Sequence, residues 1–151
     1  MDKFLDAVIN LAHEAYPEQE KLVDYEEWLA GKFEPPCLFI QVQHVGEKAN
    51  TLTSSMTVYD AGMVIHFPKS RQGVFQPVSL EPLTAILRRE RFQYPTYVNE
   101  ERILLNIDPD SYKIRLGDRK DRAEVTFRFE VTVKIPVPQV DKIEEFDIEM
   151  G

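Results

Sequence analysis

Residues 123–135 read AEVTFRFEVTVKI, and this stretch decides the fold. Its odd positions are apolar throughout, from Ala123 to Ile135, whereas its even positions are Glu, Thr, Arg or Lys. This alternation is typical of a half-buried β-strand, because successive side chains point to opposite faces of a sheet. A parallel strand covered on both faces would be apolar at every position, so the pattern predicts a long strand in a mostly antiparallel sheet.

Two further stretches are predicted to be strands. Residues 37–45 read CLFIQVQHV, and residues 55–67 read SMTVYDAGMVIHF. The polar residues 46–54 between them are expected to form a connector, and Gly62 is expected to mark a β-bulge. Shorter strands are expected at residues 21–25, 92–98, 102–108 and 111–116.

Two helices are predicted to pack on this sheet. Residues 2–16 place apolar side chains at helical spacing and stop before Pro17. Residues 80–90 form a second amphipathic stretch, for which Ser79 is the expected N-cap. The sequence therefore predicts an α+β fold in which two α-helices pack on a mostly antiparallel sheet.

The composition places limits on function. The chain has 151 residues and a formal net charge of -8, which disfavours non-specific binding to nucleic acid phosphates over most of the surface. No apolar run approaches the roughly 20 residues that a membrane span requires, so no membrane partner is expected. The single cysteine, Cys37, excludes an intrachain disulfide and fits a reducing compartment.

No catalytic motif is recognisable, so we expect no enzymatic activity and no cofactor or metal. Cys37 and His44 lie about 23 Å apart along one strand and form no dyad there. Asp60 and His66 are expected to lie on the polar side of their strand, in cross-strand polar pairs. A site assembled from distant residues, such as His44, Asp60 and His66, stays open as an alternative.

Trp28 and Phe33 lie in residues 26–36, EEWLAGKFEPP, which are expected to form a loop because of the glycine and two prolines. Both aromatic residues either fold back over the core or serve as anchors at a subunit interface, and both roles are compatible if the loop packs between subunits.

Two other loops are expected to make contacts. Residues 68–79 form a long loop that includes Lys69, Arg71 and Phe75. The cluster Arg119, Lys120 and Arg122 is short and mixed in sign, which favours a solvated or intersubunit ion-pairing loop over a nucleic acid site.

The chain divides into a domain at residues 1–135 and an acidic C-terminal arm at residues 136–151. The arm carries five acids against one lysine. Its apolar residues, interleaved with the acids, are Val140, Ile143, Phe146, Ile148 and Met150. A solvated tail does not need these apolar residues, so the arm is expected to dock on a neighbouring chain or a partner. The alternatives are an arm folded onto its own domain and a disordered tail.

Several segments together resemble tail terminator proteins of tailed bacteriophages and phage-like particles. They are Asp24–Tyr25–Glu26, the turn from Gly31 to Phe33, Glu34–Pro35 followed by Cys37–Leu38–Phe39–Ile40, and Ile65–His66–Phe67–Pro68. The resemblance covers most of residues 1–135 and rests on structural rather than catalytic motifs.

The resemblance implies a structural virion protein that forms a homohexameric ring, caps the tail tube and ends its polymerisation. The implied partners are the tail tube protein and the head–tail connector or neck protein, with the sheath protein as a further candidate. DNA would pass through the ring without being specifically bound. Such a protein is assembled in the host bacterial cytoplasm and belongs at the tail–neck junction of the virion. The alternatives are another neck, connector or tail-completion protein, a monomeric binding module, or an enzyme without a recognisable motif.

Overall fold

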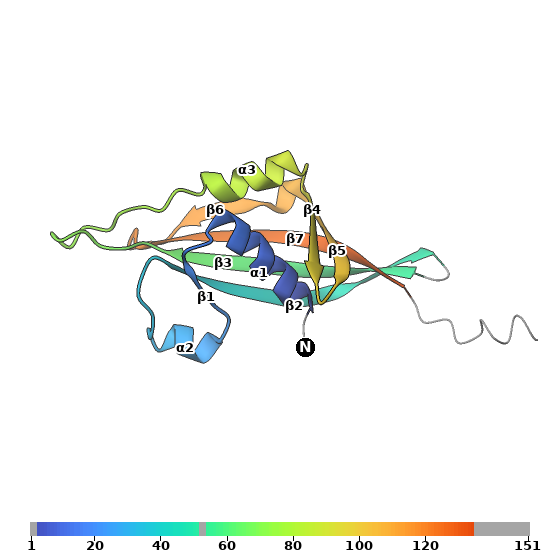
Figure 1. Cartoon of the computed structure of the whole chain (residues 1–151), viewed down its shortest axis with the longest axis horizontal. Coiled ribbons are helices and arrows are strands. Elements are labelled where there is room, and N and C mark those ends of the chain that lie inside the picture. The colour runs from blue at the N-terminus through green and yellow to red at the C-terminus, as the bar shows by residue number, and fades with distance from the viewer. Residues whose placement is uncertain (1–2, 52–53, 135–151) are drawn as a thin grey trace, which may run out of the picture.

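The computed structural model of the chain describes residues 3–51 and 54–134 (Figure 1). The elements in chain order are α1 (Lys3–Ala15), β1 (Glu20–Leu22), α2 (Tyr25–Leu29), β2 (Cys37–Thr51), β3 (Ser54–His66), α3 (Glu81–Arg89), β4 (Gln93–Val98), β5 (Glu101–Ile107), the 3-10 helix η1 (Pro109–Ser111), β6 (Lys113–Leu116) and β7 (Arg122–Lys134). The fold class is α+β, as the sequence predicts.

The strands form one sheet in the order β1-β2-β3-β7-β5-β4, and β6 pairs with the first part of β7. Only the β1–β2 pair is parallel among the described strands, so the sheet is mostly antiparallel. Strands β5 and β7 share only two residue pairs, and the β4–β5 hairpin runs steeply across the long strands in Figure 1. The sheet therefore curls around the helices.

β7 has the alternating burial that its sequence predicts. It pairs with β3 from Arg122 opposite His66 to Lys134 opposite Ser54 without interruption. The odd residues from Ala123 to Val131 are buried, and they belong to one core cluster with residues of α1 and α3. We call this covered side of the sheet the inner face. Figure 1 shows α1 crossing the long strands β2 and β3 obliquely.

The expected connector at residues 46–54 is wrong. β2 continues to Thr51 and β3 begins at Ser54, so the two strands form one long hairpin. Strand pairing continues through these residues because it depends on backbone hydrogen bonds and not on apolar side chains. The β-bulge expected at Gly62 is wrong, because Gly62 pairs in regular register with Gln41 and Thr126. The register of β2 with β3 shifts instead between His44 and Gly46 and between Ala49 and Thr51.

A third, short helix lies where the sequence predicts a loop. Asp24 begins α2 by accepting hydrogen bonds from the backbone N–H groups of Glu26 and Glu27. The carboxylate at this position satisfies donors that have no partner inside the helix. The expectation of two helices is therefore incomplete, and Tyr25 belongs to this helix and not to β1. At α3 the helix begins at Glu81 with Leu80 at the N-cap position, although the Ser79 hydroxyl still accepts from the Glu81 N–H.

Candidate functional site

The side of the sheet opposite α1 and α3, which we call the outer face, carries the largest group of interacting polar side chains. Register places Gln41 and Gln43 of β2, Asp60 and Gly62 of β3, and Thr126 and Arg128 of β7 on this face. Together with Asp108, Ser111 and Lys113 they line an open hollow of about 470 Å³. This hollow is the candidate functional site.

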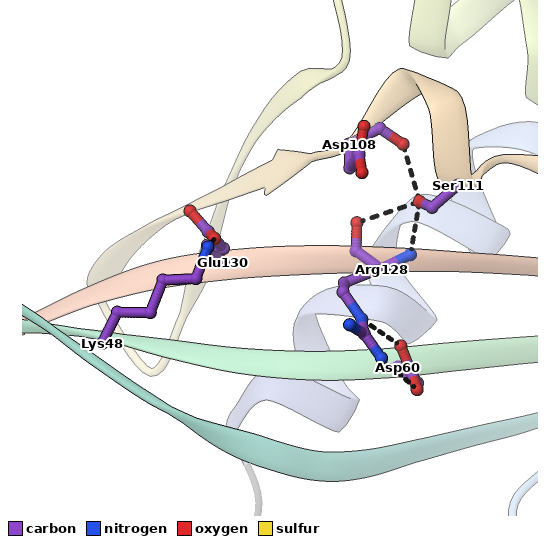
Figure 2. Close-up of polar contacts among 6 residues, drawn as sticks. All are labelled: Lys48, Asp60, Asp108, Ser111, Arg128 and Glu130. Atoms are coloured by element: carbon purple, nitrogen blue, oxygen red, sulfur yellow. Dashed lines mark hydrogen bonds and ion pairs between the residues drawn. The ribbon is translucent and has the colours of Figure 1, made fainter.

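Arg128 is the centre of this site (Figure 2). Its guanidinium donates from Nε and Nη2 to the two carboxylate oxygens of Asp60, at 2.9 and 3.2 Å. Its backbone N–H donates to the Ser111 hydroxyl at 2.8 Å, and that hydroxyl donates in turn to the carbonyl of Asp108 at 2.7 Å. The Asp108 N–H donates back to the carbonyl of Arg128 at 2.9 Å. Arg128 is thus held by both its side chain and its backbone.

The turn at Asp108–Ser111 completes the edge of β7. β6 pairs with Ala123–Thr126, and β5 pairs with Phe129 and Glu130. The Ser111 hydroxyl and the Asp108 N–H supply the partners that Arg128 needs between these two ladders. An unpaired backbone group costs free energy comparable to a lost hydrogen bond, so this turn stabilises the junction of the two strands with β7.

Two further ion pairs lie on the outer face. Lys48 contacts Glu130 at 2.5 Å across β3, and Arg115 contacts Glu124 at 2.6 Å. The Asp60 and Arg128 side chains are each 49% exposed, and exposed ion pairs contribute about 0–1 kcal/mol. These pairs therefore set the charge pattern of the face more than they stabilise the fold.

The hollow presents hydrogen-bonding side chains and a guanidinium that is paired with a carboxylate. Both oxygens of Asp60 are engaged by Arg128, so no free carboxylate faces a second one there. Within residues 3–51 and 54–134, no group of three His, Cys, Asp or Glu side chains is placed to hold a metal ion. No described helix is long and apolar enough to cross a membrane.

At the Cys37 end of β2, the outer face is apolar and covered by the segment that contains α2. Trp28 stacks on Phe39 at 4.4 Å between ring centroids, and Phe33 packs on His66 at 4.5 Å. The smaller cluster of buried residues formed there comprises Leu22, Cys37 and Phe39, with Trp28, Phe33 and Val64 packed against it. Trp28 and Phe33 thus fold back over the sheet, on the face opposite the main core.

His66 lies under this cover with 4% of its surface exposed. Its Nε2 accepts a hydrogen bond from the indole N–H of Trp28 at 2.7 Å, which requires the neutral imidazole. Burial, reinforced by Arg122, lowers the pKa of His66 to about 4, and Asp121 partly opposes this shift. Burial also raises the pKa of the neighbouring Cys37 thiol to about 11, so this cysteine is not an activated nucleophile.

The expectation of polar pairing is therefore confirmed for Asp60 and wrong for His66. Asp60 finds its partner on β7, whereas His66 is buried among aromatic rings and binds an indole from the α2 segment. His44 lies far along β2 from Cys37 and packs its ring on Tyr59, so the three residues His44, Asp60 and His66 do not meet in one site.

Two predicted contact loops lie together at one end of the molecule. Lys69 and Phe75 form an isolated β-bridge, and the Lys69 ammonium lies 4.9 Å from the centroid of the Phe75 ring. Phe75 and Lys120 line the same surface groove. Arg71 and Arg119 are exposed in these loops, whereas Arg122 is partly buried and forms an ion pair with Asp121 at 3.0 Å. Val140, Ile143, Phe146 and Ile148 lie outside the described residues.

The described residues thus form an α+β fold whose outer face carries an open hollow lined by polar side chains. Comparison of the sequence with models of known protein families found no match, and comparison with curated proteins also found none.

Proposed function

We propose that this protein is a structural assembly subunit of the tail terminator class. In this proposal it forms a ring, hexameric by its resemblance to that class, which caps a phage or phage-like tail tube and ends polymerisation. The ring also presents the surface that meets the head-side connector. The sequence resemblance is the origin of the proposal, and the outer face is the structural observation that supports it most directly.

The outer face suits a surface that passes DNA without retaining it. Asp60, Glu124 and Glu130 are each paired with a cation of the same face. A protein binds DNA mainly through ion pairs between its cationic side chains and the phosphates. Cations that are already paired with carboxylates contribute little to that attraction. The formal net charge of -8 acts in the same direction.

The end of the molecule suits a contact between subunits. Val74, Ile114 and Leu116 are large apolar side chains that are at least about half exposed there, beside exposed cations of the two loops. Apolar residues surrounded by polar ones are typical of protein interfaces. Burying these side chains against another chain would remove apolar surface from water and so favour association.

The test is the solution mass of the full chain, measured by light scattering over a wide concentration range, with and without purified tail tubes. The proposal predicts a species of about six subunits, either alone or on tubes, following the closed symmetry of ring assemblies. Electron microscopy should place that species at tube ends. A chain that keeps its monomer mass at every concentration and also ignores tubes would overturn the proposal. Binding to connectors but not to tubes would favour the alternative of a head-side neck protein.

A further inference from the structure

An apolar groove lies at the end of the molecule where the long strands meet the loop of residues 68–79. It has a volume of about 400 Å³, and most of the surface that lines it is apolar. The residues that line it include Phe67, Val74, Phe75, Pro77, Leu116 and Lys120. Val74 is 62% exposed and Leu116 is 50% exposed, so the groove is an open binding surface and not part of the core. We call it the end groove.

Cations border the end groove. Lys120 lines it, and Lys69 lies over the ring of Phe75, which also lines it. Arg71 and Arg119 are exposed in the same two loops. Within the described part of the chain none of these four side chains forms an ion pair, although Asp118 lies in the same turn as Arg119. A ligand for the groove should therefore combine apolar and acidic groups.

The C-terminal arm of this sequence has that chemistry. Residues 140–150 read VDKIEEFDIEM, in which apolar residues alternate with acids at short intervals. Its apolar side chains match the apolar lining of the groove, and its carboxylates complement the cations of the two loops that border it. The same chain thus contains both a surface and a segment that match each other.

The length of the arm limits which of its residues can reach the groove of the same chain. Described structure ends at Lys134, and Arg122 lies near the groove at the other end of the same strand, about 40 Å away at the rise of a β-strand. Figure 1 shows these two ends at opposite sides of the molecule. Ile143 is nine residues beyond Lys134 and reaches at most about 30 Å from it when fully extended. Val140 and Ile143 therefore cannot enter the groove of their own chain, whereas Phe146 and the residues after it can span this distance. An arm that places all of its apolar residues in a groove must use the groove of another copy.

We propose that the C-terminal arm of one subunit binds in the end groove of a second copy of this chain. Residues 140–150 supply the apolar anchors, and Lys69, Arg71, Arg119 and Lys120 of the neighbour receive the carboxylates. The contact is head-to-tail, because the arm and the groove are different surfaces, and such contacts generate rings when the rotation closes. The inference rests on the proposed function and assigns the surfaces that join its subunits.

The first experiment is photo-crosslinking in the full chain. A benzophenone amino acid replaces Ile143, and unlabelled protein is mixed with ¹⁵N-labelled protein before irradiation. Mass spectrometry should find crosslinks from position 143 to residues 67–77 or 116–120, in peptide pairs that combine both isotopes. Crosslinks that map outside these segments, or that stay within one isotope, would overturn the inference.

The second experiment measures binding of the arm as a free peptide. A fluorescein-labelled peptide of residues 137–151 is titrated with full-length protein carrying Ile143→Ser and Phe146→Ser, so that its own arm competes less. We expect saturable binding whose affinity decreases as salt is raised. The substitution Val74→Glu should weaken this affinity about tenfold, as for a central interface residue. Val23→Glu is the matched control, because Val23 is 47% exposed at a different part of the surface. Equal binding to the Val74→Glu protein, or no saturable binding, would refute the groove.

These results separate the inference from the function on which it rests. A ring-sized species whose crosslinks map elsewhere would overturn the arm contact and leave the terminator proposal intact. Oligomers whose arm crosslinks to the groove, but which neither cap nor bind tail tubes, would overturn the terminator proposal and retain the arm contact.

Discussion

At the scale of single residues, His66 links the sheet to the segment that covers it. It is buried beneath Trp28 and Phe33, and it accepts the indole hydrogen bond only when its Nε2 carries no proton. Cys37 lies opposite it on β2, and Arg122 and Asp121 are the charged groups that act on it. Protonation would place a charge in this apolar cover and break the bond to Trp28.

This arrangement predicts a pH-dependent stability. The unfolded chain binds a proton on His66 below about pH 6.5, whereas the folded chain does so only below about pH 4. The contribution of His66 is therefore complete above pH 6.5 and is lost as the pH falls toward 4, with a total on the order of 3 kcal/mol. Urea unfolding followed by the fluorescence of Trp28, the only tryptophan, measures it at pH 7 and pH 5.

The variant His66→Gln keeps an acceptor for the indole and does not titrate in this range. It should unfold with a smaller difference between the two pH values than the parent protein. His13→Gln is the control, because His13 is exposed on α1. An unchanged pH dependence in His66→Gln would show that His66 is not the responsible group.

At the scale of elements, Ser111 joins two separate ladders on one edge of β7. Ser111→Ala removes the acceptor of the Arg128 N–H and the donor to the Asp108 carbonyl. We expect a loss of about 1–2 kcal/mol in the free energy of unfolding, because the backbone group loses its partner. Ser70→Ala removes a hydroxyl that accepts from Val74 N–H within an exposed loop, and it should cost less. Equal losses in denaturant titrations of both variants would contradict this role for Ser111.

The elements also show how far the sequence predicts this fold. The alternating residues of β7 and the helically spaced apolar residues of α1 and α3 are sufficient to predict these three elements. Each pattern has a period that only one secondary structure matches. The hairpin beyond Gly46 and the helix at Tyr25–Leu29 do not follow from local pattern. In the first, backbone pairing continues through polar residues, and in the second, a single capping carboxylate outweighs nearby loop-forming residues.

The sequence also predicts part of the candidate site. The even residues of β7 indicate a polar face by their alternation alone. Their partners depend on register with β2, β3 and β6, and on where the Asp108–Ser111 turn meets β7. The pairing of Asp60 with Arg128 joins residues far apart in the chain, and local pattern carries no information on such contacts.

At the scale of the whole molecule, the long strands separate the two surfaces that the proposed assembly requires. The end groove lies beside the Arg122 end of β7, and the C-terminal arm begins beyond Lys134 at the other end. Val140 and Ile143 are too close to Lys134 to reach the groove of their own chain, so they can bind only the groove of another copy. Stability should then depend on concentration, because association favours the folded subunit over the unfolded one.

The last prediction concerns the thermal midpoint of the full chain. If the arm joins folded subunits, each tenfold rise in concentration adds about 1 kcal/mol per subunit, which corresponds to about 3 °C for a chain of this size. Val74→Glu should reduce this slope because it places a carboxylate in the apolar groove, whereas Val23→Glu should retain it. Calorimetry at a series of concentrations measures the slope directly. A parent midpoint that is independent of concentration would argue against association in solution, and an unchanged slope in Val74→Glu would argue that other surfaces join the subunits.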